Sequence, residues 1–164
     1  MISLTHTAEI AADRDAVFAA VTDLDRVADF VPAVEKIERL TDGPVGVGTR
    51  FRETRQVFGR SATEEFTVVA CEPPRTYAVA ALSCGARYET TFTFADAGPD
   101  TAATTLTVRT VIRPETWGAR LASPLAWLTG GAMKRAIAAD VEAIAAEAVA
   151  RHDAVLPPRS AADA

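Results

Sequence analysis

Residues 43–60 read GPVGVGTRFRETRQVFGR, and this stretch decides the fold. Its three glycines, Gly43, Gly46 and Gly48, suggest at first sight a loop that binds phosphate. Such loops lie between a strand and a helix, because the N-terminus of the helix supplies amide donors to the phosphate. After Gly48, however, β-branched and aromatic residues alternate with polar ones, which is the pattern of a strand. The stretch therefore predicts a tight bend that leads into an antiparallel strand.

Turns between the strands set the register of a whole antiparallel sheet. A two-residue turn at Gly59 and Arg60 pairs Arg55 with Glu64 across a hairpin. Further turns are predicted at residues 73–74, 84–85 and 98–99. Residues that lie opposite each other point to the same face of the sheet. Each turn therefore identifies which residues of the next strand share the apolar face of the strand before it. The members of this inward face are Phe51, Phe66, Val68, Tyr77, Val79, Phe92, Phe94, Leu106, Val108 and Ile112.

One strand and two short helices precede the sheet in the sequence. Residues 3–11 alternate between polar and apolar side chains and predict the strand. Asp13 is a typical N-cap for a helix over residues 14–21, and Asp25 starts a second short helix. The order of elements is that of an α+β protein.

After Pro114 the apolar spacing changes from two to three and four, which predicts a helix over residues 115–151. Pro124 and the pair Gly130-Gly131 are expected to bend this helix or to break it in two. The domain then covers residues 1–151, and residues 152–164 read as a disordered tail.

Composition excludes several classes of function. A chain of 164 residues with a net charge of −5 and no basic run is a poor binder of nucleic acid. No signal peptide and no apolar run long enough for a membrane span is visible, so a cytoplasmic location is expected. Two histidines and two cysteines without close spacing predict no zinc site, and no other cofactor is expected. The predicted register places Cys71 and Cys84 about 26 Å apart, too far for a disulfide.

Four segments resemble a known family. They are VTDLDRVADFVPAV at 21–34, GPVGVGTRF at 43–51, CEPPRTYAV at 71–79 and YETTFTF at 88–94, and the closing helix completes the likeness. The sequence resembles the START-like (SRPBCC) superfamily of polyketide cyclase/dehydrase type over about residues 2–151. The resemblance implies a helix-grip fold, in which a seven-stranded antiparallel sheet curves around the long C-terminal helix. It also implies a cavity for an apolar ligand between the two.

Polar residues share the inward face with the apolar ones. Glu53, Arg55 and Glu64 fall there, with Tyr88 and Thr110 on strands further along. A closed apolar core would not accept two carboxylates and a guanidinium. This end of the sheet is therefore either a solvated rim, where Arg55 and Glu64 form an ordinary salt bridge, or the polar floor of a pocket. His6, expected on the neighbouring first strand, fits a structural histidine better than a functional one.

The C-terminal helix supplies the other wall of the expected pocket. Trp117, Leu121, Leu125 and Leu128 either line it or pack the core, and the resemblance adds Trp127 and Phe30 as candidates for its mouth. The candidate ligand-binding residues are Phe51, Glu53, Arg55, Glu64, Phe66, Tyr77, Tyr88, Phe92, Thr110, Trp117, Leu121, Leu125 and Leu128.

Three functions remain open at the level of the sequence. The first is binding of a small, largely apolar lipid-, polyketide- or quinone-like molecule between sheet and helix. The second is an aromatase/cyclase- or dehydratase-type enzyme, in which Glu53, Glu64, Tyr88 or His6 would act as acid or base. The third is a protein-interaction module without a ligand. The sequence names no catalytic residue and does not decide between a monomer and a homodimer.

Overall fold

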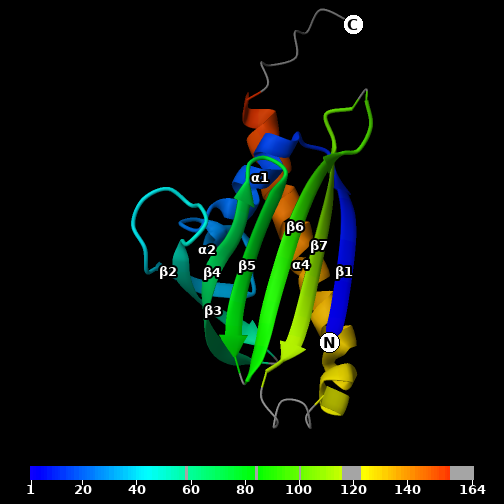
Figure 1. Ribbon diagram of the computed structural model, residues 1–164. Helices are drawn as coiled ribbons and strands as arrows, with labels where there is room; N and C mark the ends of the chain where they lie inside the picture. Colours follow the sequence, from blue (N-terminus) through cyan, green and yellow to red (C-terminus); the bar gives the residue numbers. More distant parts are fainter. Residues whose placement is uncertain (58, 84, 100, 116–122, 156–164) are drawn as a thin grey trace, which may run out of the picture.

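The computed structural model describes residues 1–57, 59–83, 85–99, 101–115 and 123–155, although not the side chains of residues 123–130. The strands are β1 Ile2–Ile10, β2 Val34–Arg39, β3 Arg50–Val57, β4 Arg60–Glu72, β5 Thr76–Ser83, β6 Ala86–Asp96 and β7 Thr104–Pro114. The helices are α1 Arg14–Thr22, α2 Val27–Phe30 and α4 Ser123–Val155. All seven strands form one antiparallel sheet in the order β1-β7-β6-β5-β4-β3-β2, with α4 behind it (Figure 1). The predicted α+β helix-grip fold is confirmed.

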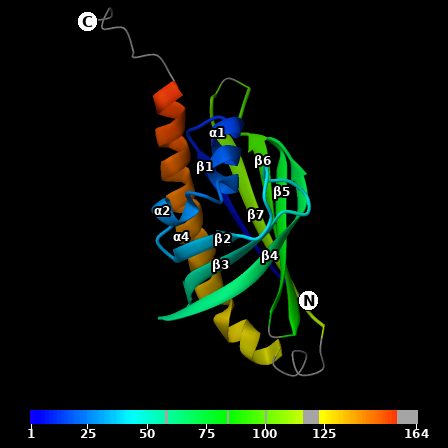
Figure 2. The same ribbon diagram turned by 90° about the vertical axis from the view of Figure 1, so that its left-hand side faces the viewer.

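The long helix α4 differs from the prediction at its beginning. Glu115 follows β7 directly, and its backbone N–H donates to the carbonyl of Gly85 at 2.8 Å. The described helix runs without a break from Ser123 to Val155, and residues 116–122 of the predicted helix lie outside the described residues. Pro124 does not interrupt it because it lies in the first turn, where its missing N–H has no helical partner to lose. The direction of the axis changes after the first turns, drawn in yellow in Figure 2, so the expected bend is present and the expected break is not.

The hydrophobic core lies at the end of the sheet that carries α1. Ile10 of β1, Val17 of α1 and Leu106 of β7 are almost completely buried there. Ala148 of α4 is also fully buried, and its small side chain allows the helix to approach the sheet closely. The other end of the sheet is packed less completely, which leaves room for the cavity described below.

Polar contacts fix the C-terminal half of α4 against α1. Asp13, the predicted N-cap, accepts a hydrogen bond from the backbone N–H of Ala16 at 2.8 Å and lies 2.9 Å from Nδ1 of His152. Arg151 donates to Asp23 at 2.7 Å. The helix is therefore held across the sheet by both apolar packing and charge.

The cap at Asp13 provides a first prediction. Asp13→Ala is expected to lower the free energy of unfolding by about 1 kcal/mol, and Asp13→Asn by less, because asparagine also caps helices. The bond to Ala16 lowers the pKa of Asp13 below its usual 3.8, so the charged form stabilises the fold. Its contribution is present above that usual value and is lost as the pH falls through the lower folded pKa. Urea unfolding at neutral and strongly acidic pH measures both effects, and equal losses at the two pH values would contradict this origin.

The hairpin register keeps the predicted faces but not all the predicted pairs. Val57 pairs with Arg60, so the first turn falls one residue earlier than predicted. Gly59, whose φ of 76° lies in the left-handed region that tight hairpin turns use, precedes Arg60 and therefore stays in the turn while Arg60 begins β4. Moving the turn by one residue shifts every pair by two and leaves each side chain on its predicted face.

The consequence for the polar residues is a change of partners. Glu53 lies opposite Glu64, and Arg55 lies opposite Ala62, so the predicted pairing of Arg55 with Glu64 is wrong. The β6–β7 pair is also shifted by two residues: the predicted turn at residues 98–99 would place Phe92 opposite Leu106, but Phe92 faces Val108.

The two hairpins around β5 follow the prediction more closely. Tyr77 faces Phe92 across β5 and β6, as the turn at residues 84–85 requires. Val68 also faces Val79 as predicted, but the register of β4 shifts between Val68 and Ala70. This irregularity, which the sequence did not indicate, brings Cys71 opposite Tyr77. Cys71 is a free thiol, and Cys84 lies outside the described residues.

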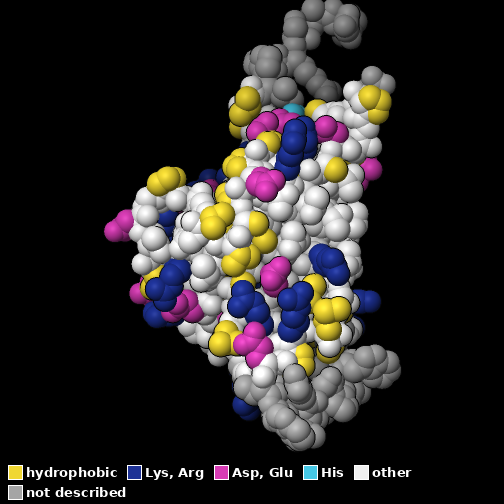
Figure 3. Space-filling view, in the orientation of Figure 1, with side chains coloured by type: hydrophobic (Ala, Val, Ile, Leu, Met, Phe, Trp, Pro, Cys, Tyr) yellow, Lys and Arg dark blue, Asp and Glu magenta, His cyan; other side chains and the backbone are white. Residues whose placement is uncertain are grey.

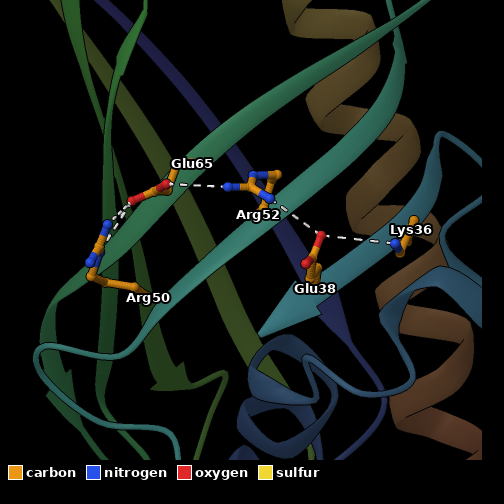
Figure 4. A network of polar contacts seen from close by, with 5 residues as sticks. All are labelled: Lys36, Glu38, Arg50, Arg52 and Glu65. Carbon is orange, nitrogen blue, oxygen red and sulfur yellow. Dashed lines mark hydrogen bonds and ion pairs between the residues drawn. The ribbon is translucent and has the colours of Figure 1, made fainter. Parts of the chain in front are cut away.

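The face of the sheet that points away from α4 is polar, as the alternation predicts. Charged side chains of both signs lie scattered over this side of the molecule, with a few hydrophobic ones between them (Figure 3). At its β2–β4 edge they form a chain of ion pairs that runs from Lys36 through Glu38, Arg52 and Glu65 to Arg50 (Figure 4). Exposed pairs of this kind contribute little to stability and keep the outer face soluble.

Candidate functional site

A cavity of about 670 Å³ lies between the concave face of the sheet and α4, with α1 and α2 along one side. This volume is within the usual range for a pocket that holds a small molecule. Most of the wall is apolar. The sheet contributes Phe51, Phe66, Tyr77, Val79, Ala81, Phe92 and Val108; the helix side contributes Val21, Leu24, Val31, Met133, Ile137, Val141 and Ile144.

The sheet residues proposed from the sequence meet at this cavity. The structure places the following in its wall: Phe51, Glu53, Arg55, Glu64, Phe66, Tyr77, Tyr88, Phe92 and Thr110. Trp117 and Leu121 lie outside the described residues, and the side chains of Leu125, Trp127 and Leu128 are not described. Phe30 is not part of the wall, since its ring packs under the guanidinium of Arg151, 5.8 Å away. His6 faces Val108 on the same side of the sheet but does not reach the cavity.

The polar side chains gather at one end of the cavity. Nη2 of Arg55 donates to Oδ2 of Asp140 at 2.6 Å, and Nε of Arg55 lies 3.4 Å from Oε1 of Glu53. Arg55 therefore lies between one carboxylate from its own strand and one from α4. Across the hairpin, Oε1 of Glu64 accepts a hydrogen bond from the hydroxyl of Ser83 at 2.6 Å. This end is a polar pocket floor partly withdrawn from solvent, because the exposed fractions of the side chains of Glu53, Asp140 and Arg55 are 16%, 23% and 28%.

Burial and neighbouring charges shift the pKa values of Glu53 and Arg55. Burial raises the pKa of Glu53 above 4.5, and the charge of Asp140 raises it further, while Arg55 works in the opposite direction. For Arg55, burial alone would lower the pKa, but Asp140 and Glu53 outweigh it and raise the pKa. The guanidinium therefore stays charged, whereas Glu53 holds its proton to a higher pH than an exposed glutamate does. A carboxyl group with a raised pKa stays available as a proton donor at a higher pH than an exposed carboxyl group does.

Asp140 is the functional candidate that the sequence prediction missed. It is 85 positions from Arg55 in the chain, so no local pattern connects the two residues. A weaker signal was present, because Asp140 follows Ile137 by three residues and precedes Ile144 by four, which puts it on the apolar face of α4. An aspartate on such a face needs a buried partner, and Arg55 is that partner.

The far end of the cavity is apolar and aromatic. The ring of Tyr77 lies 6.5 Å from that of Phe18 and 6.0 Å from that of Phe92. Tyr77 is 2% exposed, and its hydroxyl is buried without a hydrogen-bond partner among the described residues. Burial raises the pKa of Tyr77, so this hydroxyl stays protonated. Over the part of the chain that the structure describes, no group of three or more His, Cys, Asp or Glu side chains could hold a metal ion.

Comparison with known proteins agrees with this architecture. A family model described as polyketide cyclase / dehydrase and lipid transport matches residues 1–152. The chain belongs to this family. The predicted resemblance is thereby confirmed, and binding or cyclase chemistry is the general role that membership supports. No curated protein matches the sequence. None of the described helices is both long and apolar enough to cross a membrane.

Solved structures of the same fold are distant in sequence. The Zhui aromatase/cyclase from Streptomyces sp. R1128 is 23% identical at a TM-score of 0.71, covering 92% of this chain and 94% of the other. Norcoclaurine synthase from Thalictrum flavum, in complex with dopamine and hydroxybenzaldehyde, is 20% identical at a TM-score of 0.67, with 92% and 87% covered. A START superfamily protein from Mycobacterium smegmatis is 17% identical at 0.66, with 94% and 99% covered. Such identities establish the fold alone.

Proposed function

We propose that the protein binds a small, largely apolar molecule, of lipid-, polyketide- or quinone-like character, in the cavity between the sheet and α4. The observation that carries the proposal is the cavity itself, about 670 Å³ in volume, with an apolar wall and a few polar groups gathered at one end. Apolar side chains provide affinity for such a ligand, and convergent polar groups orient it. We assign the ligand-binding role to the wall residues of the sheet, with Asp140 added from α4.

The same geometry supports a second candidate, acid–base catalysis of the kind used by aromatase/cyclases and dehydratases. Glu53 is partly buried, its pKa is raised, and it lies beside Arg55 at the polar end of an apolar cavity. A protonated Glu53 could donate a proton to a carbonyl oxygen of a bound substrate, and Arg55 could stabilise the negative charge that develops there. The third interpretation, a protein-interaction module without a ligand, has no comparable support, because it does not need a cavity of this size.

Blocking the cavity tests the binding function. Ala81 lies in the wall opposite both Phe66 and Tyr88, so Ala81→Phe places a ring inside the cavity. We expect this variant to bind the neutral fluorescent probe N-phenyl-1-naphthylamine on the order of tenfold more weakly than the unchanged protein. The measurement is a fluorescence titration, accompanied by native mass spectrometry of the freshly purified protein to detect a ligand retained from the host.

A matched control lies one residue further along β5. Leu82 points to the outer face and is 65% exposed, so Leu82→Phe adds a similar ring outside the cavity. It is expected to leave the titration unchanged. If both variants bind the probe as the unchanged protein does, the probe does not enter the cavity. If the unchanged protein binds no probe and retains no ligand, the proposed function is wrong.

A further inference from the structure

The hydroxyl of Tyr77 is the feature of the cavity that the polar end does not explain. Tyr77 belongs to the wall, it is 2% exposed, and its hydroxyl oxygen has no hydrogen-bond partner among the described residues. Buried polar groups in folded proteins are almost always hydrogen-bonded, because leaving one without a partner costs free energy. A phenylalanine at this position would avoid that cost and fill nearly the same space. The hydroxyl therefore indicates a partner that the described residues do not supply.

The cavity is the side from which such a partner can arrive. Bulk water does not reach the hydroxyl, and the described rings beside it, Phe18 and Phe92, offer no strong acceptor. The thiol of Cys71, which lies opposite Tyr77 and helps to raise its pKa, makes no hydrogen bond to the hydroxyl. A molecule in the cavity would lie against the Tyr77 ring. Contact with the hydroxyl then requires a rotation of Tyr77 or of Phe92, both of which border the cavity.

We propose that the occupant of the cavity carries a hydrogen-bond acceptor, a carbonyl or ether oxygen, at its apolar end, and that the hydroxyl of Tyr77 donates to it. This inference rests on the proposed binding function and specifies the class of ligand. Burial raises the pKa of Tyr77, so the phenol keeps its proton and acts as the donor. An oxygen-free hydrocarbon would leave the hydroxyl as it is in the empty protein.

The position of Tyr77 also sets the shape of the occupant. Tyr77 and Ser83 are six residues apart on β5, which is about 20 Å along an extended strand. Ser83 donates to Glu64, and Glu64 faces Glu53, so the polar end begins at the Ser83 end of the strand. A molecule that satisfies both ends is elongated, with an apolar middle and a polar atom at each end.

The experiment compares two probes of nearly equal shape, 2-acetylnaphthalene and 2-isopropenylnaphthalene, which differ in a carbonyl oxygen against a methylene group. Each displaces N-phenyl-1-naphthylamine from the unchanged protein, from Tyr77→Phe and from Tyr88→Phe. Tyr88 is the matched control, because it also lies in the cavity wall but already makes an interaction in the empty protein. In the unchanged protein we expect the ketone to bind about 3- to 10-fold more tightly, relative to the hydrocarbon, than it does in Tyr77→Phe. If the preference is lost in Tyr88→Phe and kept in Tyr77→Phe, the ketone is bound at the polar end and the inference is overturned.

Thermal unfolding of the empty protein provides a second, independent readout. Removing an unpartnered buried hydroxyl should raise the melting temperature of Tyr77→Phe by roughly 3 °C, while ketone binding becomes weaker. A structural hydroxyl with a partner would give the opposite sign for stability.

Each outcome has one meaning. Suppose that both probes bind, but that Tyr77→Phe neither weakens the preference for the ketone nor raises the melting temperature. The inference about Tyr77 is then overturned, and the proposed binding function stands. If Tyr77→Phe lowers the melting temperature, the hydroxyl is partnered in the empty protein and the inference is also wrong. If neither probe nor the reporter binds the unchanged protein, the proposed function itself fails.

Discussion

Arg55→Met is expected to lower the free energy of unfolding by about 2–3 kcal/mol near neutral pH. The substitution keeps much of the side-chain length but removes the guanidinium that lies between Glu53 and Asp140. Two partly buried carboxylates then face each other without a described cation between them. Breaking such an ion group costs more than the group contributes when intact, because the charges left behind stay withdrawn from water.

The loss should depend on pH in a defined direction. Without Arg55, the charge that holds down the folded-state pKa of Glu53 is gone, so this pKa, which burial and Asp140 raise, moves further above its unfolded value and the folded variant binds that proton more tightly than the unfolded chain does. The stability of the variant therefore falls as the pH rises through that range, and its deficit is smaller near pH 5 than near pH 7. Urea unfolding at the two pH values measures this change, and a deficit that does not depend on pH would contradict the role assigned to Arg55.

Glu64→Gln is the matched control for this variant. Glu64 lies in the same cavity wall, but its described partner is the hydroxyl of Ser83, to which a glutamine carbonyl can also bind. The expected loss is under about 1 kcal/mol. A loss as large as that of Arg55→Met would mean that the two residues are coupled as the sequence first predicted.

Leu106→Ala is expected to lower the free energy of unfolding by about 3–4 kcal/mol and the melting temperature by roughly 10 °C. Leu106 is completely buried on β7, between Phe94 of β6 and Ala8 of β1. Removing its side chain leaves a space that the surrounding sheet and α1 cannot fill without moving together. Thermal and urea unfolding measure the loss.

Two comparisons make this prediction specific to packing. Leu82→Ala removes the same atoms from an exposed leucine and should change stability by less than about 0.5 kcal/mol. Because Leu106 is not part of the cavity wall, Leu106→Ala should leave probe binding unchanged at temperatures where the variant is folded. An effect of similar size at both leucines would show that the core does not lie where the burial pattern places it.

The sequence predicted the faces of the sheet more reliably than its pairs. Side chains along a strand alternate between the two faces. Glu53 and Arg55 therefore point inward with Phe51, and Glu64 points inward with Phe66. A turn misplaced by one residue shifts the pairing by two and does not disturb this rule. The same error changed which side chains lie opposite each other, so it produced a wrong partner for Arg55.

The helix could be predicted in its middle and less well at its N-terminal end. Spacings of three and four identified the face formed by Ile137, Val141 and Ile144, which packs toward the sheet. Pro124 was expected to bend or break the helix because the predicted beginning at residue 115 placed it in the interior of the helix. A proline in the first turn and one in the interior look alike in sequence, but only the interior one removes a helical hydrogen bond.

Local patterns determined the α+β order of elements, the polar and apolar faces, and the sheet residues that point inward, and the family resemblance added the helix-grip arrangement with its cavity. Periodicity, turn residues and capping act between neighbours in the chain, so they can be read in sequence order. The partner of Arg55 and the isolation of the Tyr77 hydroxyl depend on contacts between distant segments. Asp140 is brought to Arg55 only when α4 packs across the sheet, and Tyr77 loses water only when α1 and the neighbouring strands close over it. Tertiary packing decided these features, because burial and the direction of approach between segments are properties of the assembled fold.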